Sequence, residues 1–183
     1  MNPLSDNSIM LKVKAGDLDK MGLLFERHHR QLFGFLFHMT HERELSEDLA
    51  QNVFYRMLKY RHTFSGGGEF KTWMYHLARN VVNDHGRSLK RNIRHLDVEE
   101  FAEKIGGGQA ADMPLHKKQE LASLQRAMLK LNEESREILV LSKFQELRYH
   151  EIARILDITE GAVKVRVHRA INQLKNIFTT IGD

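Results

Sequence analysis

Apolar residues recur at every third or fourth position along most of this chain, the spacing that places them on one face of an α-helix. The clearest series is Phe70, Met74, Leu77 and Val81. Alternating runs of β-branched residues, which would predict strands, do not occur in the sequence, and its only prolines are Pro3 and Pro114. The sequence therefore predicts an all-α protein. Its 183 residues, 42% of them apolar, are enough to bury one or two small cores.

The distribution of this periodicity predicts two small helical domains joined by a flexible linker. The first domain covers residues 9–94, the linker 95–116 and the second domain 117–183. The linker is assigned because its sequence is acidic, then glycine-rich, and has no helical spacing. In the first domain, a helix over 46–60 is predicted to start with Ser46 as its N-cap. Its inward residues are expected to be Leu49, Val53, Met57 and Tyr60. The preceding long helix is expected to have a dense apolar face made of Leu23, Leu24, Phe25, Leu32, Phe33, Leu36 and Phe37.

The end of the second domain predicts a helix-turn-helix. A helix over 149–156 is followed by the short turn 157–159, which ends in the N-cap residue Thr159, and then by a long basic helix from Glu160 to about Phe178. In a major groove, Arg169 could bind guanine and Val165 could contact a thymine methyl group, with Lys164 and Arg166 placed for phosphates. The alternative is an ordinary solvent-exposed helix. The predicted DNA-facing residues are Lys164, Val165, Arg166, His168, Arg169 and Asn172.

The segment 70–87 carries a second stripe beside its apolar one. This stripe combines an aromatic ring, amides and cations, which is typical of surfaces that stack on unpaired bases and hold phosphates. Lys90, Arg91 and Arg94 extend the positive charge beyond it. The alternative is that Trp73 widens the core and the other residues form a solvated face. The stripe consists of Trp73, His76, Asn80, Asn83 and Arg87.

Other patterns point away from an enzyme, a metal site and a membrane protein. The sequence has no cysteine, and the glycine loop 65–72 lacks the glycine positions of a phosphate-binding loop. His38 and His41 have helical spacing but no third metal ligand within reach, so we expect them at the surface. No catalytic residue and no cofactor is expected. The N-terminus lacks the pattern of a signal peptide, and no apolar run is long enough to span a bilayer, so a cytoplasmic protein without membrane insertion is expected.

The order of the motifs resembles that of a bacterial sigma factor of the extracytoplasmic-function (ECF) group. The motifs are the run EDLAQNVF at 47–54, then Phe64 with a short loop, then FKTWMYHLARN at 70–80, and a helix-turn-helix containing EGAVKVRVHRA. The resemblance covers about 150 residues of the chain. It implies binding to core RNA polymerase, through its β′ and β subunits, and to promoter DNA.

The resemblance also assigns roles to individual residues. The helix over 46–60 would dock on the β′ coiled coil through Asp48, Gln51, Asn52 and Phe54. The next loop and helix would open the minus-ten element, and the helix-turn-helix would read the minus-thirty-five element. Residues implied in minus-ten opening are Phe64, Ser65, Gly66, Gly67, Gly68, Glu69, Trp73 and Asn80, and the rest of the stripe, His76, Asn83 and Arg87, is grouped with them.

Two departures from the family pattern shape the remaining expectations. Asn52 stands where the family usually has glutamate, and three glycines follow Ser65. An unordered glycine loop loses more backbone entropy on closing over a base. We therefore expect weak minus-ten selectivity, with promoter choice made by the helix-turn-helix or a DNA-bound recruiting protein; an anti-sigma factor is another expected type of partner. The alternatives are a stand-alone helix-turn-helix regulator and an RNA-binding adaptor.

Overall fold

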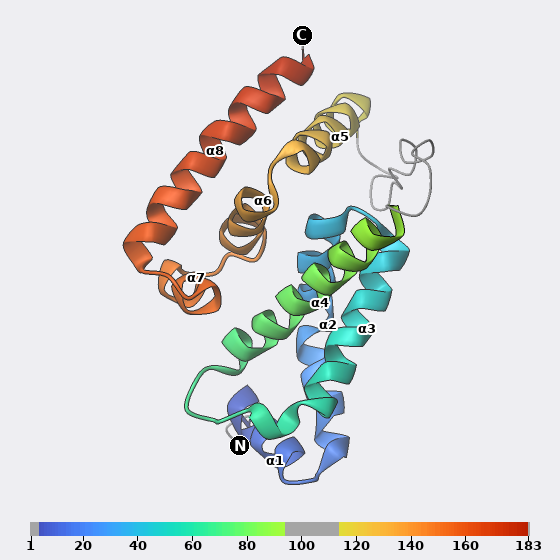
Figure 1. Ribbon diagram of the computed structural model, residues 1–183, viewed down its shortest axis with the longest axis vertical. Coiled ribbons are helices and arrows are strands. Elements are labelled where there is room, and N and C mark those ends of the chain that lie inside the picture. Colours follow the sequence, from blue (N-terminus) through green and yellow to red (C-terminus); the bar gives the residue numbers. More distant parts are fainter. Residues whose placement is uncertain (1–3, 94–113, 183) are drawn as a thin grey trace. The chain divides into compact units, whose positions relative to one another are not determined.

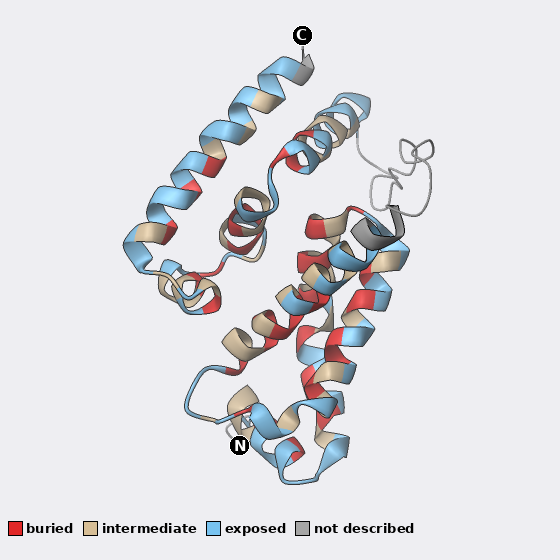
Figure 2. Ribbon diagram, in the orientation of Figure 1, coloured by how far each residue is buried: buried red, intermediate tan, exposed pale blue. Residues whose placement is uncertain are grey.

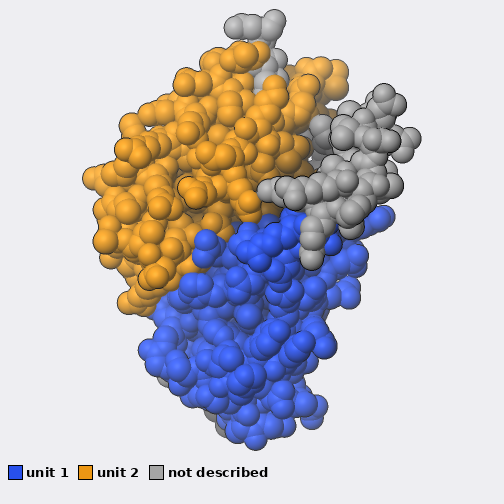
Figure 3. Space-filling view, viewed as in Figure 1, with its two compact units in different colours: residues 1–36, 44–103 blue, residues 37–43, 104–183 orange. Residues whose placement is uncertain are grey.

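The computed structural model of the protein describes residues 4–93 and 114–182, and the regular structure within these ranges is helical, with no strand. The chain divides into two compact units (Figure 3). Unit 1 comprises residues 1–36 and 44–103, and unit 2 comprises residues 37–43 and 104–183. The predicted all-α class with two helical parts is confirmed. Most of the predicted linker, residues 95–113, lies outside the described residues.

Unit 1 contains a short helix and three long ones (Figure 1). They are α1 (Asp6–Lys14), α2 (Met21–Thr40), α3 (Arg43–Lys59) and α4 (Phe70–Ile93), with the short 3-10 segments η1 (Leu18–Lys20) and η2 (Arg61–Thr63). The last residues of α2, 37–40, and the first of α3, Arg43, are counted with unit 2. Rings from α2 and α4 meet in the core, where Phe35 and Tyr75 are both fully buried and their centroids are 5.3 Å apart. The predicted apolar stripe of α4 faces this core (Figure 2), because Phe70, Met74, Leu77 and Val81 are all buried.

The start of α3 differs from the prediction. The helix begins at Arg43, so Ser46 lies inside it with no exposed surface and is not an N-cap. Leu49, Val53 and Met57 are buried as expected, but Tyr60 follows the last helical residue and is 37% exposed. The predicted inward face is therefore confirmed for the three residues within the helix and is wrong for Tyr60, which lies beyond its end. At the N-terminus, α1 starts before Ile9, because Ser5 caps it by accepting a hydrogen bond from the Ser8 amide at 3.2 Å.

The apolar residues of α2 are less uniformly buried than predicted. Leu24, Leu32 and Leu36 are buried, whereas Leu23 and Phe25 are exposed; Phe33 and Phe37 are half-buried.

The expected surface position of the two histidines near the end of α2 is wrong. His41 is only 6% exposed and His38 is half-buried. Burial, together with the positive charges of Arg136 and His38, lowers the pKa of His41 to about 4. His41 is therefore neutral at physiological pH.

Unit 2 is built around its last helix. Its elements are α5 (Leu115–Lys130), α6 (Glu133–Leu139), the π-helical segment η3 (Val140–Phe144), α7 (Tyr149–Leu156) and α8 (Glu160–Gly182). Helix α8 packs against α5, α6 and α7. The turn between α5 and α6 is held from both sides. The Asn132 side chain caps α6 at the Ser135 amide, and the Arg136 guanidinium donates to the carbonyls of Met128, Leu129 and Leu131.

The connection from α7 to α8 has the geometry of a helix-turn-helix. Asp157 ends α7 in the left-handed conformation, with φ of 54°, and the next amide, of Ile158, donates to the Ala153 carbonyl at 3.0 Å. The Thr159 hydroxyl then accepts a hydrogen bond from the Ala162 amide at 3.1 Å. The predicted turn and its N-cap are confirmed. Helix α8 continues to Gly182, a few residues beyond the predicted end.

Candidate nucleic-acid and protein interfaces

Trp73 lies at the edge of the unit 1 core. Its ring centroid is 5.3 Å from that of Phe64 and 6.3 Å from that of Phe70. Its indole Nε1 donates a hydrogen bond to the Thr63 hydroxyl at 3.3 Å, and the residue is half-buried. Trp73 therefore does widen the core, as one interpretation held, and it also keeps part of its aromatic surface open to solvent.

The rest of the α4 stripe is partly or fully exposed to solvent. His76 and Asn83 are half-buried, and Asn80 and Arg87 are exposed. The side chains of Lys90 and Arg91, and residue Arg94, lie outside what the structure describes. The described part of the stripe thus presents an aromatic edge, amides and one cation along a single helix, a combination suited to an unpaired nucleic-acid strand.

The glycine loop, residues 65–69, is held at its C-terminal end. The Asn7 side chain donates to the Gly68 carbonyl at 2.8 Å and accepts from the Phe70 amide at 2.7 Å. Within the loop, the Ser65 hydroxyl accepts from the Gly67 amide at 3.3 Å. Ser65, Gly67, Gly68 and Glu69 are exposed and Gly66 is half-buried. The loop therefore has hydrogen-bond partners within it and at its C-terminal end, and the weak minus-ten selectivity expected from its glycines stays a prediction.

Phe64, at the start of this loop, is buried, with 2% of its surface exposed. Its ring packs against Phe70 and Trp73, with centroids 6.4 Å and 5.3 Å away. A buried ring cannot stack on a base, so the structure assigns Phe64 to the support of Trp73 and corrects its grouping with residues that contact DNA.

The outer face of α3 borders a surface groove of about 660 Å³. Three of the four predicted polymerase contacts, Asp48, Gln51 and Asn52, are exposed and line it. Phe54 does not: it is 7% exposed, and its ring lies 4.9 Å from that of Phe25 on α2. The predicted contact of Phe54 with polymerase is therefore wrong, because its ring packs against α2 and does not reach the groove. The remaining lining residues are Tyr55, Arg56, Lys59, Tyr60 and Asp84.

Tyr55 is the residue of this groove that sequence reasoning missed. It is 62% exposed, more than any other large apolar or aromatic side chain of unit 1 in the described residues. The available signal was its spacing, because Tyr55 follows Gln51 by four positions and Asp48 by seven, which places all three on one helix face. An exposed aromatic ring among polar side chains is typical of a protein-binding anchor.

Polar contacts tie the groove to α4. The Asn52 side-chain oxygen accepts from Arg56 Nε at 3.1 Å, and Arg56 Nη1 is 2.8 Å from the Asp84 carboxylate. Asp84 also lies 3.8 Å from Arg87 Nη1. Asn52 is thus part of a chain of polar contacts that joins α3 to α4.

Helix α8 presents its predicted face to solvent. Lys164, Val165 and Arg166 are exposed, Val165 at 47%, as are His168, Arg169 and Asn172. The opposite face of the helix is buried, with Val163, Val167 and Ala170 at most 2% exposed. His168 Nδ1 and Asn172 Nδ2 are 3.4 Å apart, so these two side chains adjoin on the outer face. The face carries mainly positive charge and follows a capped helix N-terminus, features that favour an anionic polymer as its partner.

In the described residues, we find no helix with the length and apolar character that crossing a bilayer requires.

Comparison with known proteins covers both units. The model of Sigma-70 region 2 matches residues 24–92, and that of Sigma-70, region 4 matches residues 121–174. RNA polymerase sigma factor YlaC of Bacillus subtilis (strain 168) is 30% identical over 162 residues, which cover 88% of this chain and 93% of that protein. The ECF RNA polymerase sigma factor SigW of the same organism is 27% identical, covering 90% of this chain and 91% of SigW.

Solved structures share the fold. CnrH in complex with the cytosolic domain of CnrY has a TM-score of 0.72 at 20% identity, covering 96% of this chain and 97% of CnrH. The sigma factor RpoE of Bartonella quintana, solved with the anti-sigma factor NepR, has a TM-score of 0.67 at 22% identity, covering 86% of this chain and 96% of RpoE. From the family models and the extent of the match to YlaC, we conclude that the chain belongs to the sigma-70 family of RNA polymerase sigma factors, in the ECF group.

Proposed function

We propose that the two units of this ECF sigma factor divide promoter recognition between them, with unit 1 binding core polymerase and opening DNA and unit 2 reading the upstream element. The observation that carries this proposal is the exposure of three separate surfaces: the α3 groove, the α4 stripe with its loop, and the outer face of α8. A protein that only bound duplex DNA would have no need of the first two.

The α3 groove is the proposed site for polymerase. Asp48, Gln51 and Asn52 supply hydrogen-bonding groups around the exposed ring of Tyr55. Interfaces draw most of their binding energy from such central aromatic anchors, with polar groups around them setting orientation. We assign this groove to the β′ subunit and leave the β subunit as the second polymerase contact.

The α4 stripe and the loop 65–69 are the proposed site of strand opening. An unstacked base would lose its stacking contacts in the duplex. It would gain a stacking contact with the exposed edge of Trp73 and hydrogen bonds from Asn80 or the loop backbone. Arg87 would hold the phosphates beside it. Opening is driven by this binding, so the sigma factor catalyses no reaction itself and needs no cofactor.

The proposed function also implies a cellular location and regulatory partners. The chain would work in the cytoplasm, where polymerase and promoter DNA are found. An anti-sigma factor would block its polymerase-binding surfaces, or a DNA-bound protein would help to recruit it to promoters. Support for the first comes from the related fold of RpoE, which was solved with an anti-sigma factor. A stand-alone regulator or an RNA-binding adaptor would leave the matching of both sigma regions unexplained.

Co-purification with core RNA polymerase, followed by runoff transcription from a genomic library, tests the proposed function. We expect the protein to form a stable complex with core enzyme and to produce defined transcripts only when present. Tight binding to promoter duplex without polymerase, together with no sigma-dependent transcript, would support the stand-alone regulator instead.

Two substitutions in α8 test the assignment of its outer face. Arg169→Ala should relax preference at one or two positions of the upstream element, because a bidentate contact to guanine discriminates by about 1–3 kcal/mol. Lys164→Ala should weaken binding evenly across sequences. It should also reduce the slope of the logarithm of the binding constant against the logarithm of the salt concentration by about one. Transcription from a library randomised upstream distinguishes the two, and identical profiles for both variants would contradict the assignment.

A further inference from the structure

One face of α1 follows the glycine loop residue by residue. Asn7, Leu11 and Lys14 are spaced at i, i+4 and i+7, so they lie on the same side of this nine-residue helix. Each contacts a different part of the segment 64–70. We call these three residues the bracing face. Neither the polymerase groove nor the α4 stripe includes any of them.

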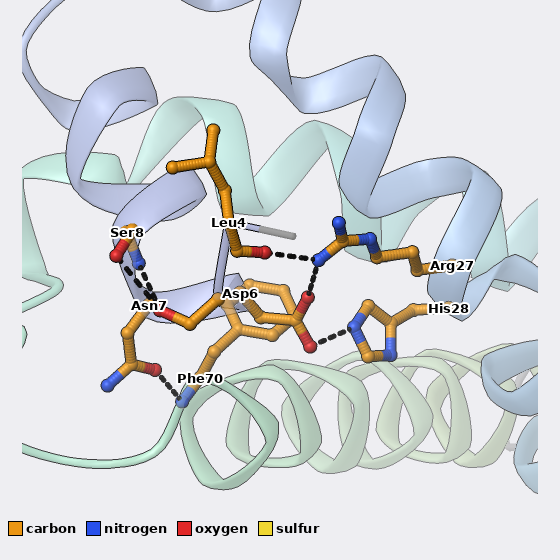
Figure 4. A network of polar contacts seen from close by, with 8 residues as sticks. Leu4, Asp6, Asn7, Ser8, Arg27, His28 and Phe70 are labelled. Carbon is orange, nitrogen blue, oxygen red and sulfur yellow. Dashed lines mark hydrogen bonds and ion pairs between the residues drawn. The ribbon is translucent and has the colours of Figure 1, made fainter. Parts of the chain in front are cut away.

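Asn7 makes the most specific of these contacts. Its amide nitrogen donates to the Gly68 carbonyl at 2.8 Å. Its oxygen accepts from the Phe70 amide at 2.7 Å (Figure 4). Phe70 is the first residue of α4, and its amide is among those that have no partner within the helix itself. Asn7 therefore caps α4 from a position 63 residues away in the sequence.

Leu11 and Lys14 complete the bracing face. Gly66 has a φ of +77°, and a Cβ added there would come within 3.0 Å of Leu11 Cδ2. The loop backbone thus passes directly over the leucine. Lys14 Nζ donates to the Phe64 carbonyl at 2.6 Å, where the loop leaves η2. The loop is consequently contacted at its start, its middle and its end.

Helix α1 is itself anchored to α2, so the bracing face has a fixed base. The Asp6 carboxylate accepts from Arg27 Nη1 at 2.8 Å and lies 2.7 Å from His28 Nε2, and Arg27 also donates to the Leu4 carbonyl (Figure 4). Burial raises the pKa of the Asp6 carboxyl, but the hydrogen bonds and charges of Arg27 and His28 outweigh it and place the pKa below its ordinary value. The carboxylate therefore stays ionised near neutral pH.

From these contacts we propose that α1 is a positioning element for strand opening, which holds the glycine loop in the conformation that receives the unstacked base. This rests on the proposed role of the loop in opening. Flexible glycines would otherwise have to be ordered when the base arrives, and the bracing face supplies that order in advance. Asn7, Leu11 and Lys14 touch no base; they act through the loop.

Hydrogen exchange in the isolated protein tests whether α1 holds the loop. In Asn7→Ala the Phe70 amide should exchange about threefold to tenfold faster, because it loses its only side-chain acceptor in the described contacts. The Met74 amide, inside α4, should be unchanged. Asn7→Asp keeps the acceptor for Phe70 but loses the donor to Gly68, so its effect on the Phe70 amide should be smaller. Equal acceleration at both amides would indicate general unfolding and overturn the positioning role.

Promoter opening by the reconstituted holoenzyme tests the functional consequence. Lys14→Ala and Asn7→Ala should slow formation of permanganate-reactive open complex by about threefold to tenfold, with core affinity and closed-complex formation unchanged. Lys12→Ala is the matched control, since it removes the same charge from α1 at a residue outside the bracing face.

The outcomes separate the inference from the proposed function. Equal opening rates for Lys14→Ala and Lys12→Ala, or normal opening in an Asn7→Ala protein whose Phe70 amide exchanges fast, would overturn the positioning role. If the wild-type holoenzyme opens no promoter at all, the proposed function itself falls, and with it the link between α1 and opening.

Discussion

Replacing Tyr55 and Gln51 together by alanine is expected to weaken binding to core RNA polymerase by about 2–4 kcal/mol, or about 30- to 1000-fold. Tyr55 is the most exposed aromatic ring on α3, and Gln51 lies one turn before it in the same groove. Because both side chains are exposed, the fold of unit 1 should survive. The measurement is a titration of labelled core enzyme with each variant, accompanied by circular dichroism.

Two control variants decide what a loss of affinity means. Phe54→Ala removes a buried ring and should cost about 3–5 kcal/mol of folding stability, so its effect on polymerase binding would be indirect. Glu26→Gln changes an exposed side chain of α2 that does not line the groove and should bind normally. Undiminished affinity in the Tyr55 and Gln51 double variant, with normal helicity, would show that polymerase docks elsewhere.

Trp73→Ala and Asn80→Ala should reduce open complex while leaving closed complex nearly unchanged. Stacking of one base on an aromatic ring contributes about 1–3 kcal/mol, which corresponds to a loss of about fivefold to 150-fold in the equilibrium constant between closed and open complex. The measurement compares permanganate reactivity of the melted region with retention of closed complex on the same promoter.

The half-buried position of Trp73 requires a control for stability. Its ring packs against Phe64 and Phe70, so alanine also removes core contacts. Trp73→Phe keeps an aromatic face and should restore much of the opening, whereas Asn80→Ala alters an exposed side chain and should not change thermal unfolding. If Trp73→Ala unfolds unit 1 and Asn80→Ala opens DNA normally, the stripe serves packing alone.

Local patterns predicted the parts of this protein that depend on a single helix. The apolar stripe of α4 and the exposed face of α8 follow from helical periodicity, and both agree with the burial seen in the structure. The turn before α8 follows from the capping chemistry of Thr159. In each case the residues that decide the outcome lie within a few positions of one another.

Predictions failed where a second element decides the outcome. Ser46 has the chemistry of an N-cap, but α3 starts three residues earlier, and the serine is buried. The family resemblance implies that Phe54 contacts polymerase, whereas its ring packs against Phe25 of α2. The contacts of Asn7 and Lys14 with the loop could not be predicted, because they join residues 50 to 63 positions apart without any repeating pattern.

The same long separations affect the order in which the nascent chain acquires its structure. Helix α1 has nine residues, fewer than the about 12–15 that an isolated helix needs to be even marginally stable in water. Its partners, Phe64, Gly66, Gly68 and Phe70, are synthesised only after α2 and α3. We therefore expect α1, although translated before α2, α3 and α4, to be among the last helices of unit 1 to fold during synthesis, so that its docking on the loop completes the unit.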